Sequence, residues 1–266
     1  MKYLFFIILA MVPLCILVFR PRVAKRFNGD FQGIKTEVFV APVLTLAIFL
    51  CSFMGFQTTT AFQKARLTAT NEGSAVQQLY ETAGLIPNGG GKDLQATSIC
   101  YARSVKFLDW PATAKFSSSP VTDLWSIRLD REIEKTINAP SPIVSRLLST
   151  EGAQTDTRFV RLADARASLP GIMVFLVVLS VFGAVILTST FAIASMRRGM
   201  VFLIAGTLAF LLAGSLFVVE TLDEPYSGIV RITPSAITKV EKSINDQFEV
   251  SYPGVSLPCD AEGNPA

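Results

Sequence analysis

The sequence GMVFLIAGTLAFLLAGSLFVV, residues 199–219, contains 21 consecutive residues without a charged side chain. An α-helix rises about 1.5 Å per residue, so about 20 such residues cross the roughly 30 Å hydrocarbon core of a bilayer. Backbone N–H and C=O groups cannot stay unpaired in lipid, and a helix pairs them within one segment. The stretch therefore predicts a transmembrane helix in an integral membrane protein.

Three further apolar blocks precede this one, at Tyr3–Phe19, Val38–Phe56 and Ala167–Met196. We therefore expect four transmembrane helices, the third beginning near Pro170, which suits the first turn of a helix. The first block resembles a signal peptide. However, no small-residue cleavage site follows it and basic residues come directly next, so we interpret it as an uncleaved anchor.

The composition argues against an enzyme. The chain has no histidine among its 266 residues, which removes the usual catalytic triads and histidine metal sites. It has no cysteine pair at zinc or redox spacing, no phosphate-binding glycine loop and no dinucleotide fingerprint. We therefore expect no catalytic residues, no cofactor and no metal. The net charge of +3 is too small to indicate nucleic-acid binding.

The predicted fold class is all-α, with four transmembrane helices and a helical extramembrane bundle formed by extensions of spans two and three. Residues 1–56 hold spans one and two with a short basic loop, and residues 169–222 hold spans three and four. The extramembrane segment is 57–168. Residues 223–266 form an extramembrane tail whose end we expect to be disordered.

Helical periodicity and turn signals divide the extramembrane segment. Apolar residues at three- and four-residue steps predict that span two continues as one helix to about Gly84. A second helix is expected over Asp93–Leu108, ending before Trp110-Pro111. A third starts at Ser119-Pro120 and a fourth at Ser141-Pro142, each with a capping serine, and the fourth runs towards span three.

The basic residues give an orientation. The two short loops between spans carry Arg20, Arg22, Lys25, Arg26 and Lys35, and Arg197 and Arg198. Positive residues in short loops favour the cytoplasm. We therefore place the multi-pass chain in the plasma or inner membrane, with the large helical segment and both termini on the non-cytoplasmic side.

The four cysteines divide into two pairs. Cys15 and Cys51 lie within spans, whereas Cys100 and Cys259 lie in extramembrane parts that share one side of the membrane in any four-span arrangement. If that side is oxidising, these two can form a disulfide. Two unrelated thiols remain the alternative, because sequence does not supply the distance between them.

Small and hydroxyl residues mark the membrane helices. Thr58 and Thr59 lie just after Gly55-Phe56, beyond one glutamine, at the exit of span two. They are interpreted either as ordinary interface polarity or as a pore-lining ring in an oligomer. The four-spaced alanines of span four, at 205, 209 and 213, are typical of helix packing.

The sequence LDEPYSG, residues 222–228, follows span four. Pro225 cannot continue the helix, Gly228 permits a tight turn, and Tyr226 has the ring expected at the headgroup level. An ordinary helix stop explains these features. The alternative hypothesis is a hinge in which Asp223 pairs with Arg66 or Arg166.

Several pieces of the sequence, taken together in order, resemble the bacterial bestrophin-like membrane proteins. They are Gly55, Phe56, Ala61, Phe62, Ala65, Arg66, Glu72, Leu79 and Tyr80, then Tyr101, Asp109-Trp110-Pro111, Leu124-Trp125, Arg161, Ala163, Arg166, Leu169-Pro170 and finally LDEPYSG. The resemblance covers about Val43 to Lys242, and it supplies no established catalytic or ligand residue.

This resemblance implies a function. Bestrophins are pentameric anion channels, so the resemblance implies a homo-oligomeric ion channel in the lipid bilayer. The alternative is a non-conducting structural or regulatory membrane subunit that binds a partner protein through its helical bundle. Bestrophins keep their termini and their helical part in the cytoplasm, which is opposite to the orientation that the basic loops indicate.

Overall fold

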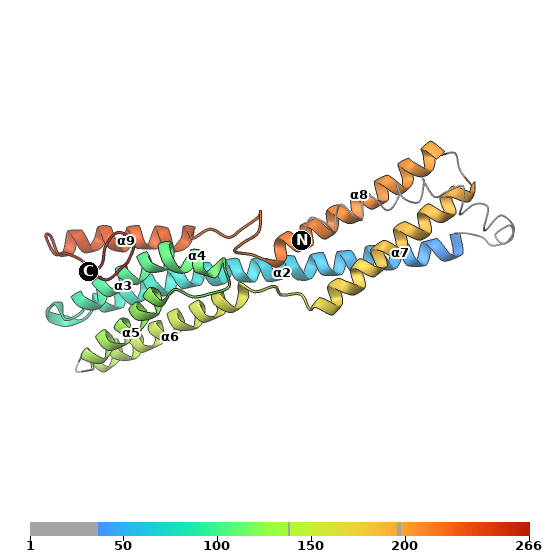
Figure 1. Cartoon of the computed structure of the whole chain (residues 1–266). Coiled ribbons are helices and arrows are strands. Elements are labelled where there is room, and N and C mark those ends of the chain that lie inside the picture. Colours follow the sequence, from blue (N-terminus) through green and yellow to red (C-terminus); the bar gives the residue numbers. More distant parts are fainter. Residues whose placement is uncertain (1–36, 138, 196–197) are drawn as a thin grey trace. The chain divides into compact units, whose positions relative to one another are not determined.

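The computed structural model describes residues 37–137, 139–195 and 198–266. In these ranges the regular elements are helices, apart from one isolated β-bridge between Cys259 and Pro265 (Figure 1). The expected first span, Tyr3–Phe19, lies outside the described residues. The chain divides into two compact units. We call them the apolar unit, up to Thr60 together with Ser168–Asp223, and the polar unit, Ala61–Ala167 together with Glu224–Ala266.

The apolar unit is built from α2 (Glu37–Ala83) as far as Thr60, α7 (Gly171–Ser195) and α8 (Arg198–Asp223). Among the described residues, three helical stretches are long and apolar enough to cross a membrane: Val40–Ala83, Gly171–Thr188 and Leu203–Asp223. These helices correspond to three of the four expected spans. The protein is therefore a helical membrane protein.

The core of the apolar unit joins these three helices. It contains Cys51 and Met54 of α2, Val177, Val181 and Val185 of α7, and Ala209, Leu212, Leu216 and Val219 of α8. Ala205 and Ala209 are buried and Ala213 packs against the same core. The alanine stripe of span four thus lies in a helix interface, as its spacing predicts.

Helix α2 runs past the apolar segment without a break, as the periodicity predicts, and its 47 residues end at Ala83. A tight turn follows, in which Asn88 and Gly89 have φ values of 60° and 71°. The chain then passes against the end of α2. A Cβ atom at Gly91 would lie 1.9 Å from the Ala83 carbonyl oxygen, so this close approach requires glycine.

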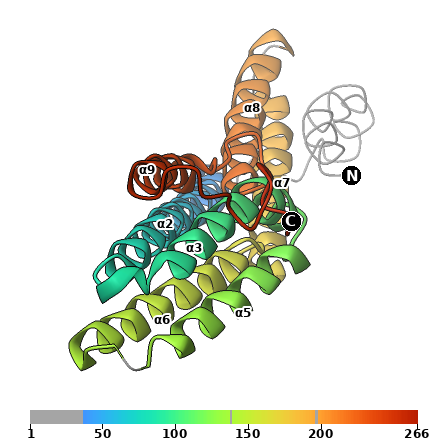
Figure 2. The ribbon, with the colours of Figure 1, turned by 90° about the vertical axis from the view of Figure 1, so that its left-hand side faces the viewer.

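The polar unit contains the second half of α2 and several shorter helices: η1 (Pro87–Gly89), α3 (Lys92–Ser104), the π-helix η2 (Val105–Asp109), α4 (Trp110–Thr113), α5 (Pro120–Lys135), α6 (Ser141–Asp164) and α9 (Ser235–Ser251). Helix α3 packs against both α5 and α9, and Figure 2 shows the helices of this unit running side by side. Leu79, Ile99, Trp125, Leu147 and Phe248 are fully buried in the shared core.

Two of the predicted helix ends are wrong. The helix that we expected to end before Trp110 continues through Pro111 to Thr113. The wide turn of η2 ends two residues before this proline, and Pro111 then lies in the first turn of α4, where a missing N–H costs little. In addition, Pro140 rather than Ser141 is the N-cap of α6. Neither serine forms a side-chain cap hydrogen bond. The backbone N–H of Ser119 donates to Asp109.

Helix α6 does not extend into the third span as we expected. It ends at Asp164, and α7 begins at Gly171. The residue before a proline is disfavoured in helical conformation, so Pro170 separates the two helices. Asp223 stabilises this break, because its Oδ1 accepts hydrogen bonds from the Ser168 and Leu169 backbone N–H groups at 2.9 and 3.1 Å.

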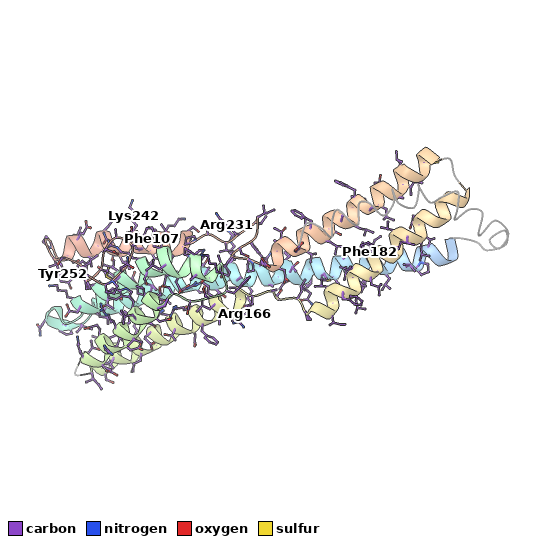
Figure 3. The ribbon with its side chains drawn as sticks, viewed as in Figure 1. Phe107, Arg166, Phe182, Arg231, Lys242 and Tyr252 are labelled. Atoms are coloured by element: carbon purple, nitrogen blue, oxygen red, sulfur yellow. A yellow bond between two sulfur atoms is a disulfide. The ribbon has the colours of Figure 1, made fainter. Side chains whose placement is uncertain are left out.

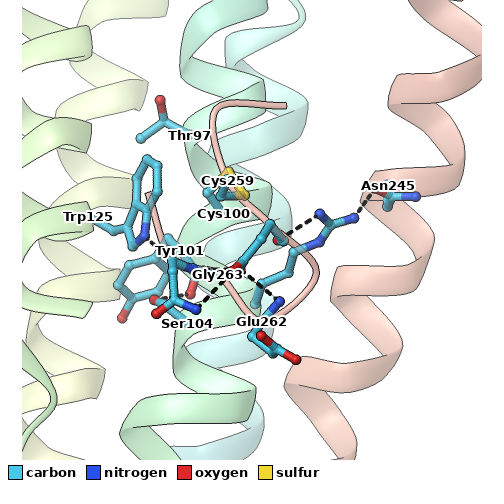
Figure 4. Close-up of a disulfide and its surroundings, with 12 residues drawn as sticks. Thr97, Cys100, Tyr101, Ser104, Trp125, Asn245, Cys259, Glu262 and Gly263 are labelled. Atoms are coloured by element: carbon cyan, nitrogen blue, oxygen red, sulfur yellow. Dashed lines mark hydrogen bonds between the residues drawn. A yellow bond between two sulfur atoms is a disulfide. The ribbon is translucent and has the colours of Figure 1, made fainter. Parts of the chain in front are cut away.

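The expected disorder at the end of the chain is also wrong, because the tail packs against α3 and α5 (Figure 4). Cys100 and Cys259 form a disulfide, with Cα atoms 5.8 Å apart. Trp125 donates its indole N–H to the Gly263 carbonyl oxygen at 2.6 Å. Gly263 has a φ of 88°, and a Cβ atom there would lie 2.4 Å from the Ser104 nitrogen. The disulfide and this glycine contact order the tail.

Candidate functional site: a buried charge cluster in the polar unit

The most strongly charged buried region of the polar unit joins five of its elements. Glu72 comes from α2, Tyr101 from α3, Asp109 from the end of η2, Asp123 from α5, and Arg158 and Arg161 from α6. Glu72, Asp109 and Arg161 are completely buried. The two arginines are three residues apart, which places both on the buried face of α6. We refer to these six residues as the charge cluster.

Arg161 lies at the centre of the charge cluster. Its Nε and Nη2 donate to the two oxygens of Glu72 at 2.6 and 3.2 Å, and its Nη1 donates to the Thr113 hydroxyl at 2.6 Å. Nη2 also donates to Asp109 Oδ2. The guanidinium lies over the Trp110 ring, 5.2 Å from its centroid. Each of the three guanidinium nitrogens of this buried cation therefore donates to a carboxylate or a hydroxyl, and the group also contacts an aromatic ring.

Asp109 connects the two arginines. Arg158 donates to both of its oxygens at 3.3 Å, and the Ser119 backbone N–H donates to Oδ1 at 2.7 Å. Arg158 also donates to Asp123 at 2.7 Å, and the side chain of Asp123 is half exposed at 49%. The charge cluster thus extends from the centre of the polar unit to its surface.

Burial and charge oppose each other in this region. Burial alone would raise the pKa of Asp109, but the guanidinium groups of Arg161 and Arg158 outweigh it and hold this pKa below its usual value. For Arg161, burial opposes the charged form, yet Glu72 and Asp109 raise its pKa. Burial and the neighbouring Glu72 raise the pKa of Tyr101, whose hydroxyl donates to that carboxylate at 3.2 Å. Asp109 and Arg161 therefore stay charged at neutral pH, and Tyr101 stays neutral.

The geometry of the charge cluster suits a structural role. The carboxylates of Glu72 and Asp109 are fully hydrogen-bonded, so neither is available as a general base. The described residues contain no group of three or more His, Cys, Asp or Glu side chains that could hold a metal ion. The charge cluster instead fixes the positions of α2, η2, α5 and α6 relative to one another within the polar unit.

Three of the sequence-predicted residues differ widely in their surroundings. Glu72 belongs to the charge cluster. Arg66 is exposed on α2, and Arg166 is exposed just beyond the end of α6 (Figure 3). Neither arginine has an ion pair among the described residues. Arg66 and Arg166 belong to the polar unit and Asp223 to the apolar unit, so a pairing between them stays a prediction.

The LDEPYSG segment was interpreted as a turn at the membrane interface, and the structure differs from this interpretation at Tyr226. Helix α8 ends at Asp223, as the following proline predicts. Tyr226, however, is buried in the core of the polar unit, where its hydroxyl donates to the Ala65 carbonyl oxygen at 3.2 Å and its ring contacts Trp110 edge-on. Gly228 is not among the described glycines with positive φ. The hydroxyl of this tyrosine finds its acceptor inside the protein, so it needs no headgroup.

The residues at the exit of span two lie on different faces of α2. Thr58 is buried, and its hydroxyl donates to the Met54 carbonyl oxygen at 3.0 Å. Thr59 is exposed and donates to the Gly55 carbonyl oxygen at 2.7 Å. Phe56 is 68% exposed, whereas Gly55 lies towards Val219 of α8, 4.0 Å from an added Cβ. Of these four residues, only Phe56 and Thr59 are exposed on a shared face of α2.

Arg158, Arg161 and Asp109 were not among the predicted site residues, although the last two belong to the sequence pieces that carry the family resemblance. One signal was available in the sequence. The buried residues of α6 include Leu147, Gln154, Arg158 and Arg161, which recur at helical spacing. Two arginines at such core positions indicate buried acidic partners.

The structure defines the class of the protein. It is a membrane protein that has three apolar helices among the described residues and a second, helical unit. The Bestrophin-like domain matches residues 6–237. The chain therefore belongs to the Bestrophin-like family.

Solved structures agree with this assignment. A variant of a bacterial bestrophin homologue from Klebsiella pneumoniae is 12% identical, with a TM-score of 0.72 and coverage of 91% of this chain and 96% of that chain. Another crystal structure of this homologue is 10% identical, with a TM-score of 0.71 and coverage of 93% and 98%. At such low identity the likeness shows the fold alone. A search of curated proteins found no match.

Proposed function

We propose that the protein is a homo-oligomeric ion channel whose pathway is lined by one face of α2. The observation that carries this proposal is a stripe of exposed residues in the apolar unit: Thr45, Phe49, Ser52, Phe56 and Thr59. Their spacing of four, three, four and three residues places them on one face of the helix. Phe49 and Phe56 are 64% and 68% exposed. We call these residues the α2 stripe.

The composition of the α2 stripe differs from that of a lipid-facing surface. Between Ile172 and Thr188, the exposed side chains of α7 are all apolar: Ile172, Met173, Val174, Phe175, Leu176, Leu179 and Ile186. The α2 stripe alternates hydroxyl and phenyl side chains. In an oligomer, α2 helices around a common axis would form rings of hydroxyls and aromatic constrictions. The preference for anions rests on the family resemblance alone.

The test is flux through liposomes that contain the purified protein. We expect chloride or iodide flux above that of empty liposomes. Ser52→Cys should make this flux sensitive to charged thiol reagents, because the residue would face the pathway. Phe210→Cys, at a 76% exposed position on α8, is the matched control and should stay insensitive. Flux at the empty-liposome level from a folded oligomer removes the channel proposal.

The second candidate is a non-conducting structural or regulatory subunit that binds a partner protein. Phe159 and Leu148 of α6 favour it, because these apolar side chains are 73% and 55% exposed in the polar unit. A subunit of this kind shows no conductance and co-purifies with its partner. Neither candidate assigns a catalytic reaction to the chain, and we propose that it is not an enzyme.

We also propose that the polar unit is outside the cytoplasm. The disulfide between Cys100 and Cys259 is of the kind that persists in oxidising compartments. The basic residues of the two short loops favour the same orientation. We keep the segment boundaries expected from the sequence and propose that residues 57–168 form the extramembrane part between spans two and three.

A further inference from the structure

A groove runs between α2 and α9 within the polar unit. It has a volume of 540 Å³ and is lined by Phe62, Arg66 and Thr70 of α2, by Arg231 and Thr233 of the segment before α9, and by Lys239 of α9. Figure 3 shows Arg231 on that segment. Two stretches of sequence more than 150 residues apart thus converge on one open cavity. We call it the α2–α9 groove.

The ionisable residues that line the α2–α9 groove are all basic. Arg66, Arg231 and Lys239 line it, and no aspartate or glutamate does. None of these three cations has an ion pair among the described residues. Like charges that converge without a counter-charge repel one another, and a bound anion relieves this repulsion.

A second groove of the polar unit provides the contrast. It is lined by Lys92, Arg128, Arg131 and Lys135, but also by Asp93 and Glu132. Lys135 forms an ion pair with Glu132 at 2.7 Å. The positive charge of this second groove is thus partly neutralised within the protein, whereas that of the α2–α9 groove is not.

Uncharged donors add to the basic residues. Thr233 and Ser235 line the α2–α9 groove, and α9 begins at Ser235. The first backbone N–H groups of a helix have no partner within it and carry partial positive charge. This end of α9 lies against α2 at Gly73, where an added Cβ would be 3.4 Å from the Ala236 carbonyl carbon, in ordinary van der Waals contact.

We propose that the α2–α9 groove binds a phosphate group. A tetrahedral oxyanion has several oxygens, so two guanidinium forks, an ammonium and hydroxyls can bind it together. A single halide ion offers no such set of acceptors. The apolar wall formed by Phe62, Ile232 and Val240 suits a phosphate that carries an organic group. The phosphate is either that of a soluble molecule or that of an anionic lipid headgroup, and the proposal does not depend on conduction.

The experiment uses the full-length protein and two probes. Calorimetric titration with inorganic phosphate, in uncharged detergent at constant ionic strength, measures free phosphate. Native mass spectrometry of protein from phosphatidylcholine nanodiscs, with and without phosphatidylglycerol, measures the lipid. In the double variant Arg66→Gln/Arg231→Gln we expect binding of the preferred probe to weaken at least about tenfold per arginine, because charge-assisted hydrogen bonds are lost.

Matched variants separate the groove from charge in general. Lys115→Gln/Arg146→Gln removes two exposed cations elsewhere in the polar unit and should leave binding unchanged. Arg66→Lys/Arg231→Lys keeps the charges but loses the guanidinium forks, so it should bind more weakly than the unmodified protein and more tightly than the glutamine variant, and it also controls for folding. If Arg66→Gln/Arg231→Gln loses binding of inorganic phosphate, the ligand is a soluble phosphate. If this variant instead loses the retained phosphatidylglycerol, the ligand is a lipid. The proposal is overturned if Arg66→Gln/Arg231→Gln and Lys115→Gln/Arg146→Gln weaken binding equally. It is also overturned if the unmodified protein binds neither probe.

Discussion

At the residue scale, the charge cluster is the feature on which stability of the polar unit should depend most. Asp109→Asn leaves Arg158 and Arg161 without their shared carboxylate, and breaking a buried pair in this way costs roughly 3–5 kcal/mol. We therefore expect a clear fall in the thermal unfolding midpoint of the detergent-solubilised protein. Lys135→Gln removes a cation from a pair whose lysine side chain is 67% exposed, and should leave the midpoint nearly unchanged. Equal unfolding midpoints for Asp109→Asn and Lys135→Gln would contradict the stabilising role of the charge cluster.

The depressed pKa of Asp109 predicts a particular dependence on pH. The carboxyl has an ordinary pKa of 3.8, and its folded-state pKa lies lower because of Arg161 and Arg158. The stability that this group contributes is therefore present above the ordinary value and is lost as pH falls through the folded value. We expect the unfolding midpoint of the unmodified protein to fall more steeply below about pH 4 than that of Asp109→Asn. Parallel curves would show that other groups govern acid unfolding.

At the element scale, the disulfide should control whether the tail stays packed. It closes a loop of 159 residues in sequence separation, which in the chain-entropy description stabilises the folded state by about 5 kcal/mol at most. After reduction, we expect limited proteolysis to cleave residues 252–266 and the fluorescence of Trp125 to change as its bond to Gly263 is lost. Reduced Cys259→Ser should match the reduced protein. Tail cleavage that is equally fast before reduction would argue against this role.

The Asp223 side chain has two competing explanations that one mutant series separates. In the structure it accepts hydrogen bonds from the Ser168 and Leu169 backbone N–H groups, just before α7 begins, so Asp223→Ala should destabilise the protein by about 1 kcal/mol, a loss similar to that of a helix cap. If instead it pairs with an arginine, Asp223→Arg combined with Arg66→Asp or Arg166→Asp should unfold at a higher temperature than its worse single mutant. Double mutants that are never better than the worse single mutant leave only the capping role.

The elements divide into those that sequence reasoning could predict and those that it could not. Helix α2 follows from its continuous apolar periodicity. Helix α9 carried a readable signal in Ile237, Ile244 and Phe248, at seven- and four-residue steps, but its polar composition and three later prolines suggested a loose tail. The order of residues 252–266 could not be predicted, because it depends on contacts such as Trp125 to Gly263, which are 138 residues apart.

The same limit applies to the charge cluster. Local pattern places Arg158 and Arg161 on one face of α6, but Glu72 lies 89 residues away from Arg161 and Asp109 lies 52 residues away. Helical periodicity identifies which face is buried and says nothing about which charge from another helix meets it. Tyr226 was misplaced for a related reason, since its acceptor at Ala65 is 161 residues away.

At the scale of the whole molecule, orientation is open to direct measurement. With Cys15 and Cys51 replaced and the disulfide kept, Ser118→Cys should react with an impermeant maleimide in intact cells. Arg197→Cys, in the basic loop between spans three and four, should not react. The opposite pattern would place the polar unit in the cytoplasm, as in the bestrophins that the sequence resembles, and would make a stable disulfide there unexpected.

The division of the polar unit into two stretches has a consequence for how the protein is made. Residues 61–167 leave the ribosome first, and residues 224–266 follow only after the 56 residues of 168–223, which include α7 and α8. Until α9 arrives, the surfaces that will cover Ile244 and Phe248 are open, and Cys100 has no partner. Biogenesis of this protein therefore includes an interval in which the polar unit is only partly synthesised while α7 and α8 are being made.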